Sequence, residues 1–121
     1  MIKIGIVGPC AAGKSTLIRE LKNIGVDARH IAQEHSGVKD MWQRLVHPDL
    51  LVFLDASFEE TVRRKSLNWR EGEYEEQQRR LAHARDHADL YIFTDGLTVK
   101  QVLDRILAMI DQHHANNFNT R

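Results

Sequence analysis

Apolar residues fall into four short runs along the chain, and stretches with helical spacing separate these runs. The run Leu50–Leu54 is the strongest strand signal, and the apolar residues just before Gly8 read as a short strand buried on both faces. The strands predicted in this way are residues 2–7, 26–33, 50–55 and 90–94. Strands that alternate with helices indicate a mostly parallel sheet covered by helices, so the pattern predicts the α/β class.

The helices between these runs are marked by their ends and by one apolar face. Ser57 with Glu60, and Thr98 with Gln101, have the form of capping boxes, which begin helices. The first predicted helix runs from Gly13 to a stop at Gly25, and the second covers 38–46. Gly72 divides the charged segment 56–88 into two further helices. The last helix begins at Thr98, and its polar end frays from His113.

Length and composition narrow the class of protein. The 121 residues fit one domain, which we assign to 1–114, with a polar tail over 115–121. The 17 basic and 17 acidic side chains cancel, which excludes a globally basic nucleic-acid-binding protein. The one cysteine, Cys10, excludes an internal disulfide or a cysteine-cluster zinc site and favours a reducing compartment. No long apolar run or signal-peptide pattern occurs, so we expect a cytoplasmic protein without a membrane or nucleic-acid partner.

The residues from Gly8 to Ser15 carry the most specific chemistry in the sequence. They read Gly-Pro-Cys-Ala-Ala-Gly-Lys-Ser and fit G-x-x-x-x-G-K-[ST] without a mismatch, directly after a strand and before a helix. Glycines let the backbone curl so that successive N–H groups point into one concavity at a helix N-terminus, which favours anions. Lys14 can reach the β- and γ-phosphates of a nucleotide, so we expect its side chain to face solvent or ligand, and the Ser15 hydroxyl can ligate Mg²⁺.

A nucleoside triphosphate with Mg²⁺ is therefore the expected ligand of this loop. ATP is favoured over GTP because the guanine-specific Asn-Lys-x-Asp run does not occur in the sequence. Cys10 is interpreted as a small side chain that fills the loop rather than as a functional thiol. The residues predicted to hold the triphosphate are Gly8, Ala11, Ala12, Gly13, Lys14, Ser15 and Thr16.

Three stretches carry a resemblance to a known family. The opening IGIVGPCAAGKSTL resembles P-loop kinases of the nucleoside monophosphate kinase type. The stretch PDLLVFLDASFEETVRRK is similar to the strand and helix before the lid of thymidylate-kinase-like enzymes, and YIFTDGLTVKQVLDRI is similar to their last strand and C-terminal helix. Of the three stretches, only the loop is a specific motif; the other two are patterns of residue type and order. The resemblance implies a three-layer P-loop NTPase fold with a helical lid-like segment over 56–88, and transfer of the γ-phosphoryl group of ATP–Mg²⁺.

The resemblance also implies roles for individual residues. Arg63, Arg64 and Arg70 fall where the family has lid arginines that close over the transferring phosphoryl group beside Lys14. Each is equally consistent with a solvated helix surface, since residues 59–89 hold seven basic and eight acidic side chains. The acceptor-binding insertion of the family is shortened here, and its Asp-x-x-Arg motif does not occur, so the acceptor stays an unidentified small molecule.

Two acids compete for the role of steadying Mg²⁺. Asp55 ends an apolar strand in the Walker B manner, but it also reads as a turn residue before the helix that Ser57 caps. Glu34 follows the second strand, and ligands bind at the carboxyl ends of parallel strands in folds of this class. Asp95 has a similar place after the last strand but reads more simply as a turn residue. Both Asp55 and Glu34 stay open as metal-site residues.

The histidines and tryptophans receive plainer interpretations. His83 and His87 are spaced i, i+4 as in a metal-binding pair, but no third ligand lies nearby in the sequence, so we interpret them as exposed. Trp42 and Trp69 have the spacing of helix-packing residues rather than of a base-stacking site.

These observations leave two classes of function. The first is a phosphotransferase that uses ATP–Mg²⁺ on a small acceptor, with Lys14, Arg63, Arg64 and Arg70 as its catalytic side chains. The second is a nucleotide-binding regulatory or assembly module with slow or no hydrolysis. The oligomeric state stays open, a homo-oligomer included.

Overall fold

Four parallel strands form one sheet in the order β2-β1-β3-β4, in a computed structural model that describes residues 2–65 and 69–119. The strands are β1 (Lys3–Val7), β2 (Asp27–His30), β3 (Leu50–Asp55) and β4 (Leu90–Phe93). All three pairings are parallel, with Ile6 opposite both His30 of β2 and Val52 of β3. The predicted parallel sheet of an α/β protein is therefore confirmed.

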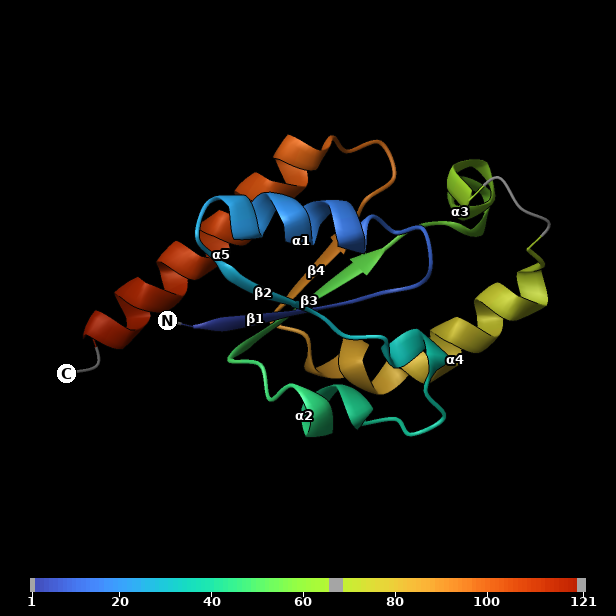
Figure 1. The fold of residues 1–121 in the computed structure, drawn as a ribbon, viewed down its shortest axis with the longest axis horizontal. Helices are drawn as coiled ribbons and strands as arrows, with labels where there is room; N and C mark the ends of the chain where they lie inside the picture. Colours follow the sequence, from blue (N-terminus) through green and yellow to red (C-terminus); the bar gives the residue numbers. More distant parts are fainter. Residues whose placement is uncertain (1, 66–68, 120–121) are drawn as a thin grey trace.

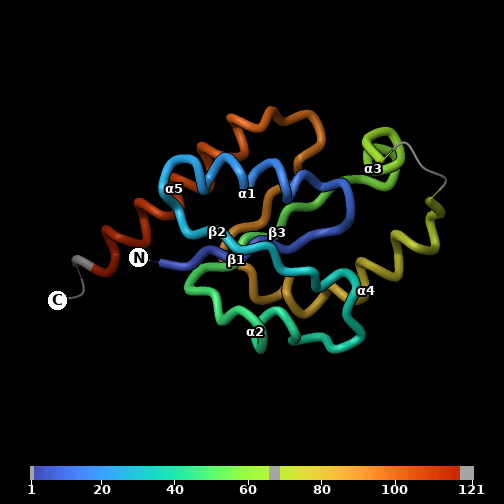
Figure 2. The backbone as a smooth tube through the Cα atoms, viewed as in Figure 1, coloured from blue at the N-terminus to red at the C-terminus, as the bar shows by residue number. Residues whose placement is uncertain are grey.

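Helices cover both faces of this sheet, which gives three layers (Figure 1). The helices α1 and α5 lie on one face, and α2 and α4 lie on the other; α3 lies beyond the carboxyl edge of the strands. Their bounds are α1 (Lys14–Asn23), the 3-10 turn η1 (Gln33–His35), α2 (Met41–Leu45), α3 (Phe58–Lys65), α4 (Glu71–His87) and α5 (Val99–Asn119). Figure 2 shows that both termini lie at the end of the molecule away from the loop that joins β1 to α1.

The alternation of side chains along β3 divides the core between the two faces. Leu50, Val52 and Leu54 pack with α1 and α5, whereas Leu51 and Phe53 pack with α2 and α4. Because successive side chains of a strand point to opposite faces, a strand that is apolar at every position must be covered on both sides. The same alternation directs Asp55 toward the α4 side.

The position of β1 determines where the loop Gly8–Ser15 lies. The chain passes from β1 through α1 to β2 on one side, and then crosses back over to β3 on the other side of β1. This reversal makes the carboxyl end of β1 the switch point of the sheet, where crevices form in folds of this class. The loop therefore stands between the ends of β2 and β3.

Two predicted helix starts have side-chain caps in the structure. Thr98 and Gln101 form the full reciprocal box, with Gln101 N donating to Thr98 Oγ1 at 3.1 Å and Thr98 N donating to Gln101 Oε1 at 2.8 Å. Ser57 forms half of its box, since Glu60 N donates to Ser57 Oγ. The Ser57 N–H donates to Asp95 instead. The Glu60 carboxylate accepts from Arg64 and Arg63.

Two expectations about the helices were wrong. Gly72 does not divide the charged segment, because it lies in the first turn of α4; α3 ends at Lys65 and α4 begins at Glu71. The chain after His113 does not fray, because α5 continues through Asn119. Polar pairs one turn apart, such as Gln112 with Asn116 at 3.0 Å, support that extension.

Among residues 2–65 and 69–119, no helix combines the length and the apolar character that crossing a membrane requires.

Candidate functional site

The loop between β1 and α1 owes its shape to two glycines. Gly8 lies against β3 so closely that a Cβ there would overlap the Leu54 carbonyl oxygen, so only glycine fits. Gly13 has φ +100° at the start of α1, in the left-handed region that glycine adopts readily. Ala11 also has a positive φ, of 66°, and Ala12 N donates to Pro9 O at 3.3 Å. The loop thus curls at the N-terminus of α1.

Lys14 lies inside this curl. Its ammonium donates to the carbonyl oxygens of Gly8 and, at 3.1 Å, of Pro9, and it forms an ion pair with Glu34 Oε2 at 2.7 Å. Only 6% of Lys14 is exposed, so of the two expected placements the one that faces solvent is excluded, and the one that faces a ligand stays a prediction. The physical reason is that a buried ammonium must keep its hydrogen bonds, and the loop and η1 supply them.

Glu34 is the acid that the fold brings to the loop. It belongs to η1, which follows β2, and it is 3% exposed. One carboxylate oxygen accepts from Lys14, while the other, Oε1, is buried without a hydrogen-bond partner among the described residues. Glu34 is therefore half-satisfied, and a buried carboxylate oxygen in that state favours an incoming cation or donor.

The mouth of the loop opens into a hollow of about 290 Å³. The first N–H groups of α1 have no partner within the helix and carry its positive end, which makes this hollow suitable for an anion. Partial desolvation, and then the Lys14 charge, lower the pKa of His30 at the rim. The hollow is lined by Cys10, Ala11, Gly13, Lys14, Ser15, Thr16, His30 and Glu34, most of which were predicted to hold phosphates or metal.

A second hollow, of about 250 Å³, lies beside the first on the α1 and α5 side of the sheet. The two share Gly13 and Thr16, so they adjoin at the start of α1. The remaining lining is largely aliphatic and comes from α1, β3, the segment that joins β4 to α5, and the start of α5: Leu17, Leu54, Leu97, Val99 and Val102.

The three predicted lid arginines have different surroundings. Arg64 turns from α3 to the loop, where it donates to Ala11 O at 3.1 Å and to Thr94 Oγ1 at 3.3 Å. Arg63, one residue earlier, is exposed and pairs with Glu60 on the same helix. Arg70 is exposed at the residue that precedes α4. Of the three, the fold brings Arg64 to the loop.

Asp55 belongs to a separate network on the α4 side of the sheet. Its Oδ1 accepts from Ala56 N and Gln78 Nε2, each at 2.9 Å, and its Oδ2 accepts from Tyr91 Oη at 2.6 Å. Arg85 lies 3.6 Å from Oδ2. Desolvation, together with this hydrogen bond to Asp55, raises the pKa of Tyr91 to about 12. Both Asp55 oxygens therefore have protein donors, and its metal role stays a prediction.

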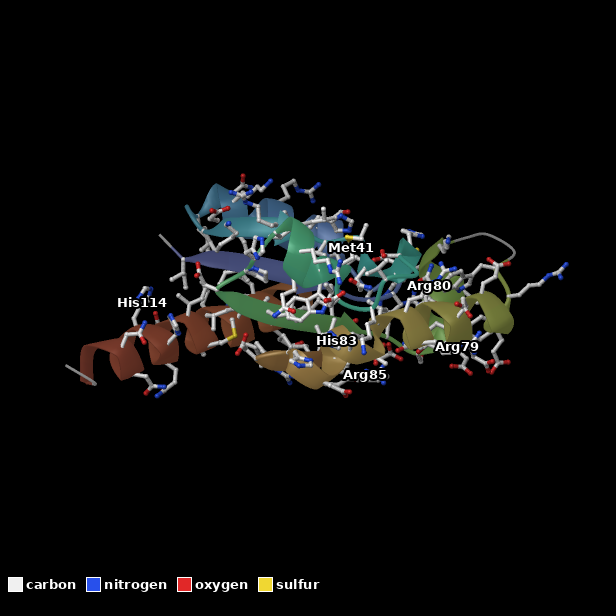
Figure 3. The ribbon with its side chains drawn as sticks, turned by 90° about the horizontal axis from the view of Figure 1, so that it is seen from below. Met41, Arg79, Arg80, His83, Arg85 and His114 are labelled. Carbon is white, nitrogen blue, oxygen red and sulfur yellow. The ribbon has the colours of Figure 1, made fainter. Side chains whose placement is uncertain are left out.

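A third hollow, of about 510 Å³, separates η1 from the start of α4. Lys65 and Trp69 line it, with the ammonium of Lys65 4.3 Å from the centre of the Trp69 ring. Arg79 and Arg80 line it from α4, where Figure 3 shows them on the half of the helix that extends away from His83. The acidic side chains Glu73 and Glu76 line this hollow as well, and Glu76 pairs with both arginines, so its charge is mixed. His35, the neighbour of Glu34 in the chain, also borders it.

The other aromatic candidates have structural contacts. His83 accepts from the indole N–H of Trp42 at 3.1 Å and stacks on His87, with ring centres 4.2 Å apart. Trp69 is buried and donates to Thr61 Oγ1 at 3.0 Å. The packing interpretation of both tryptophans is confirmed, whereas His83 is half-buried rather than exposed.

Sequence reasoning missed three residues that touch the loop. Gln77 of α4 exchanges two hydrogen bonds with Cys10, and His35 lies 3.8 Å from Cys10 Sγ. Thr94, just after the carboxyl end of β4, accepts a hydrogen bond from Arg64. The rule that ligands bind at the carboxyl ends of parallel strands could have drawn attention to this position. No signal in the sequence connects Gln77 with Cys10, since 67 residues separate them.

No family model matches the sequence, and no curated protein matches it.

Proposed function

We propose that this chain is a P-loop protein that binds a nucleoside triphosphate, ATP in particular, with Mg²⁺ at the loop Gly8–Ser15. The observation that carries the proposal is the coincidence of motif and place. A G-x-x-x-x-G-K-S loop curls at a helix N-terminus, at the switch point of a parallel sheet, and opens into a hollow. The sequence motif and the position of the loop in the fold are independent observations, and both favour a polyphosphate ligand.

The hollow at the loop mouth fits the phosphates and the metal. A triphosphate there would take the place of the Gly8 and Pro9 carbonyl oxygens as partner of the Lys14 ammonium. Mg²⁺ prefers oxygen ligands, and the hollow offers the Ser15 hydroxyl and the unpartnered carboxylate oxygen of Glu34. When bound, Mg²⁺ would neutralise charge on the phosphate oxygens. Glu34 is therefore favoured over Asp55, whose oxygens already have donors.

The adjoining aliphatic hollow suits the base and sugar. It meets the phosphate hollow at Gly13 and Thr16, so one ligand can extend through both. An aliphatic lining from Leu17, Leu97 and Val99 favours the flat apolar face of a base. This arrangement supports a nucleotide rather than free phosphate as the ligand.

Transfer of the γ-phosphoryl group to a small acceptor is the activity that these residues support best. The acceptor oxygen would attack the γ-phosphorus, the bond from that phosphorus to the bridging oxygen would break, and ADP would leave with the electron pair. Lys14 and Arg64 would stabilise the charge that develops, since both side chains already contact the loop. The hollow between η1 and α4 offers room for the acceptor.

A second candidate is a nucleotide-binding module with slow or no turnover. The three protein partners of the Lys14 ammonium favour this second candidate, because a nucleotide must displace some of them before it binds tightly. The short connection from β2 to β3 also favours it, since η1 and α2 are the only helices there.

Calorimetry with ATP–Mg²⁺ tests the shared part of both candidates. We expect Lys14→Met to weaken binding about 10- to 100-fold, because a hydrogen bond to a charged group contributes about 1.5–3 kcal/mol. Lys22→Met is the matched control, since Lys22 is exposed in the last turn of the same helix. The double variant Lys14→Met, Glu34→Gln avoids an unpaired buried carboxylate, and its thermal midpoint reports whether the fold persists. Equal affinity of both lysine variants would refute the proposal.

ADP release then separates the two candidates. Protein with ATP–Mg²⁺ would be incubated with nucleosides, nucleotides and small alcohols, one at a time. Acceptor-dependent ADP release supports the phosphotransferase. Tight ATP binding with no stimulation by any acceptor supports the binding module.

A further inference from the structure

Three metal-ligating side chains meet at the mouth of the loop, on the side of η1. Cys10, Glu34 and His35 each offer one ligand atom, and these atoms all lie within 4.8 Å of one another. Cys10 Sγ lies 3.8 Å from His35 Nε2, which in turn lies 3.8 Å from Glu34 Oε2. Neither Cys10 nor His35 has a part in the proposed nucleotide chemistry.

These separations are close to the edges of a zinc coordination tetrahedron. Zinc binds sulfur at about 2.3 Å and imidazole nitrogen or carboxylate oxygen at about 2.0–2.2 Å, so neighbouring ligand atoms lie roughly 3.4–3.6 Å apart. The Cys10–His35 pair at 3.8 Å needs to shorten by only a few tenths of an ångström. The 3.8 Å from His35 to Glu34 is measured to Oε2, the oxygen that also accepts from Lys14, and the three ligand atoms lie within 4.8 Å of one another. Since the His35 side chain is well exposed and Cys10 is half-buried, small side-chain rotations can supply that change.

Glu34 supplies an independent sign of a missing cation. Its Oε1 is buried and has no hydrogen-bond partner among the described residues, although Oε2 is paired with Lys14. Leaving such an oxygen unsatisfied costs about 1–3 kcal/mol, and a cation ligated there would remove the cost. With two oxygens, Glu34 can retain Lys14 on one and ligate a metal with the other.

Gln77 fixes the position of Cys10 at the loop. Its side-chain amide donates to Cys10 Sγ at 3.2 Å, and its amide oxygen accepts from Cys10 N at 2.9 Å. Gln77 is buried, so this pair of hydrogen bonds fixes the direction of the thiol in the way that outer partners orient metal ligands.

We propose that Cys10, Glu34 and His35 form a site for one thiophilic divalent cation, Zn²⁺ above all, with a fourth position open to solvent. Thiolate and imidazole ligands select zinc over magnesium, so the site is distinct in chemistry from the Mg²⁺ position at Ser15. Binding replaces the thiol proton, which passes to solvent. Because Glu34 serves both positions, a bound zinc ion competes with ATP–Mg²⁺; this competition rests on the proposed function, whereas the zinc site does not.

Cobalt titration of the nucleotide-free protein tests the site, since Co²⁺ replaces Zn²⁺ and gives a thiolate-to-metal absorption band. We expect the band in the unaltered protein, its loss when Zn²⁺ is added, and its absence in Cys10→Ser. We expect His35→Gln to weaken Co²⁺ binding at least tenfold. His114→Gln is the matched control and should leave the affinity unchanged, because His114 lies on α5 at the end of the molecule away from Arg79 and Arg80 (Figure 3).

Three results would overturn the site: no thiolate band at millimolar Co²⁺, a His35→Gln variant that binds like the unaltered protein, or equal weakening in His114→Gln. The competition is measured separately, with zinc-loaded protein freed of unbound metal and titrated with ATP–Mg²⁺. We expect at least tenfold weaker ATP binding, and Cys10→Ser treated in the same way should show no such change. Metal-free protein that binds no ATP would refute the proposed function and leave the zinc site standing.

Discussion

Two buried acids lie on either side of β1, the strand that leads into the loop, and their surroundings differ. Glu34 follows β2 and Asp55 ends β3, and these are the two neighbours of β1 in the sheet. Glu34 has one oxygen on the Lys14 ammonium and one without a partner among the described residues. Asp55 has donors on both oxygens, from the backbone N–H of Ala56, from α4 and from β4.

The difference teaches that a strand-end acid is not a metal ligand by position alone. Asp55 is directed to the α4 face by the alternation of β3, where Gln78 and Tyr91 satisfy it as a structural group. Glu34 lies in the 3-10 turn η1 after β2, beside the loop, and keeps ligand capacity. Four substitutions test this contrast.

Asp55→Ala should have the largest effect, and the effect should be on stability. Its removal leaves Tyr91 and Gln78 donors without their acceptor, and hydrogen bonds to a charged group contribute about 1.5–3 kcal/mol each. We expect the free energy of unfolding to fall by about 3 kcal/mol in urea denaturation. Asp86→Ala on the exposed side of α4 should change it by less than about 0.5 kcal/mol. A loss below about 1 kcal/mol for Asp55→Ala would contradict the structural role.

Glu34→Gln should lower stability, because it removes the charge that pairs with the buried Lys14 ammonium, and it should also change the metal dependence of ATP binding. It keeps the size of the side chain and removes the charge, so the gain in ATP affinity on adding Mg²⁺ should shrink about tenfold, or about 1.4 kcal/mol. Calorimetry with and without Mg²⁺ measures this ratio. Asp55→Asn is the comparison variant and should leave the ratio unchanged; the opposite ranking would make Asp55 the metal acid.

Arg64→Ala should weaken ATP–Mg²⁺ binding about five- to tenfold, because Arg64 brings its charge to the loop at Ala11. Arg63→Ala is the control in the same helix turn. Arg63 is exposed and its pair with Glu60 is a surface ion pair, which contributes little. Binding curves for the two variants side by side give the result, and similar losses in both would remove the distinction between them.

Tyr91→Phe should have the smallest effect, visible in alkaline solution. Folding raises the pKa of Tyr91 from 10.0 to about 12, so the folded protein retains a proton that the unfolded chain has lost between those values. This contribution to stability is complete below pH 10 and disappears as the pH rises toward 12. The stability advantage of the unaltered protein over Tyr91→Phe, measured by urea denaturation, should therefore shrink across that interval. An advantage that grows with pH would contradict the sign.

Local signals predicted most of the elements. The four strands, the caps at Ser57 and Thr98, and the stop at Gly25 depend on neighbours in the chain and have their predicted places, except that the second strand ends at His30 and Gln33 belongs to η1. The role of Gly72 was not predictable in this way, because a glycine in the first turn of a helix costs little and need not end it.

The candidate site was predictable only in part. The loop residues follow from a contiguous motif, and Glu34 was reached through the rule that ligands bind at strand ends. The sequence could not predict that Arg64 rather than Arg63 contacts the loop. Adjacent residues on a helix point in directions about 100° apart, and only packing decides which one meets the loop. Gln77 and His35 come from segments whose approach to Cys10 is set by how α4 and η1 cover the sheet.

By itself, the sequence determined the α/β class and a loop with the composition of a phosphate cradle, because both follow from short-range pattern and glycine conformation. Only the tertiary structure decided that Lys14 is buried on Glu34, that Asp55 is held by α4 and β4, and that Cys10 has a histidine and a carboxylate beside it. Contacts between residues far apart in the chain depend on the strand order and on which face each helix covers.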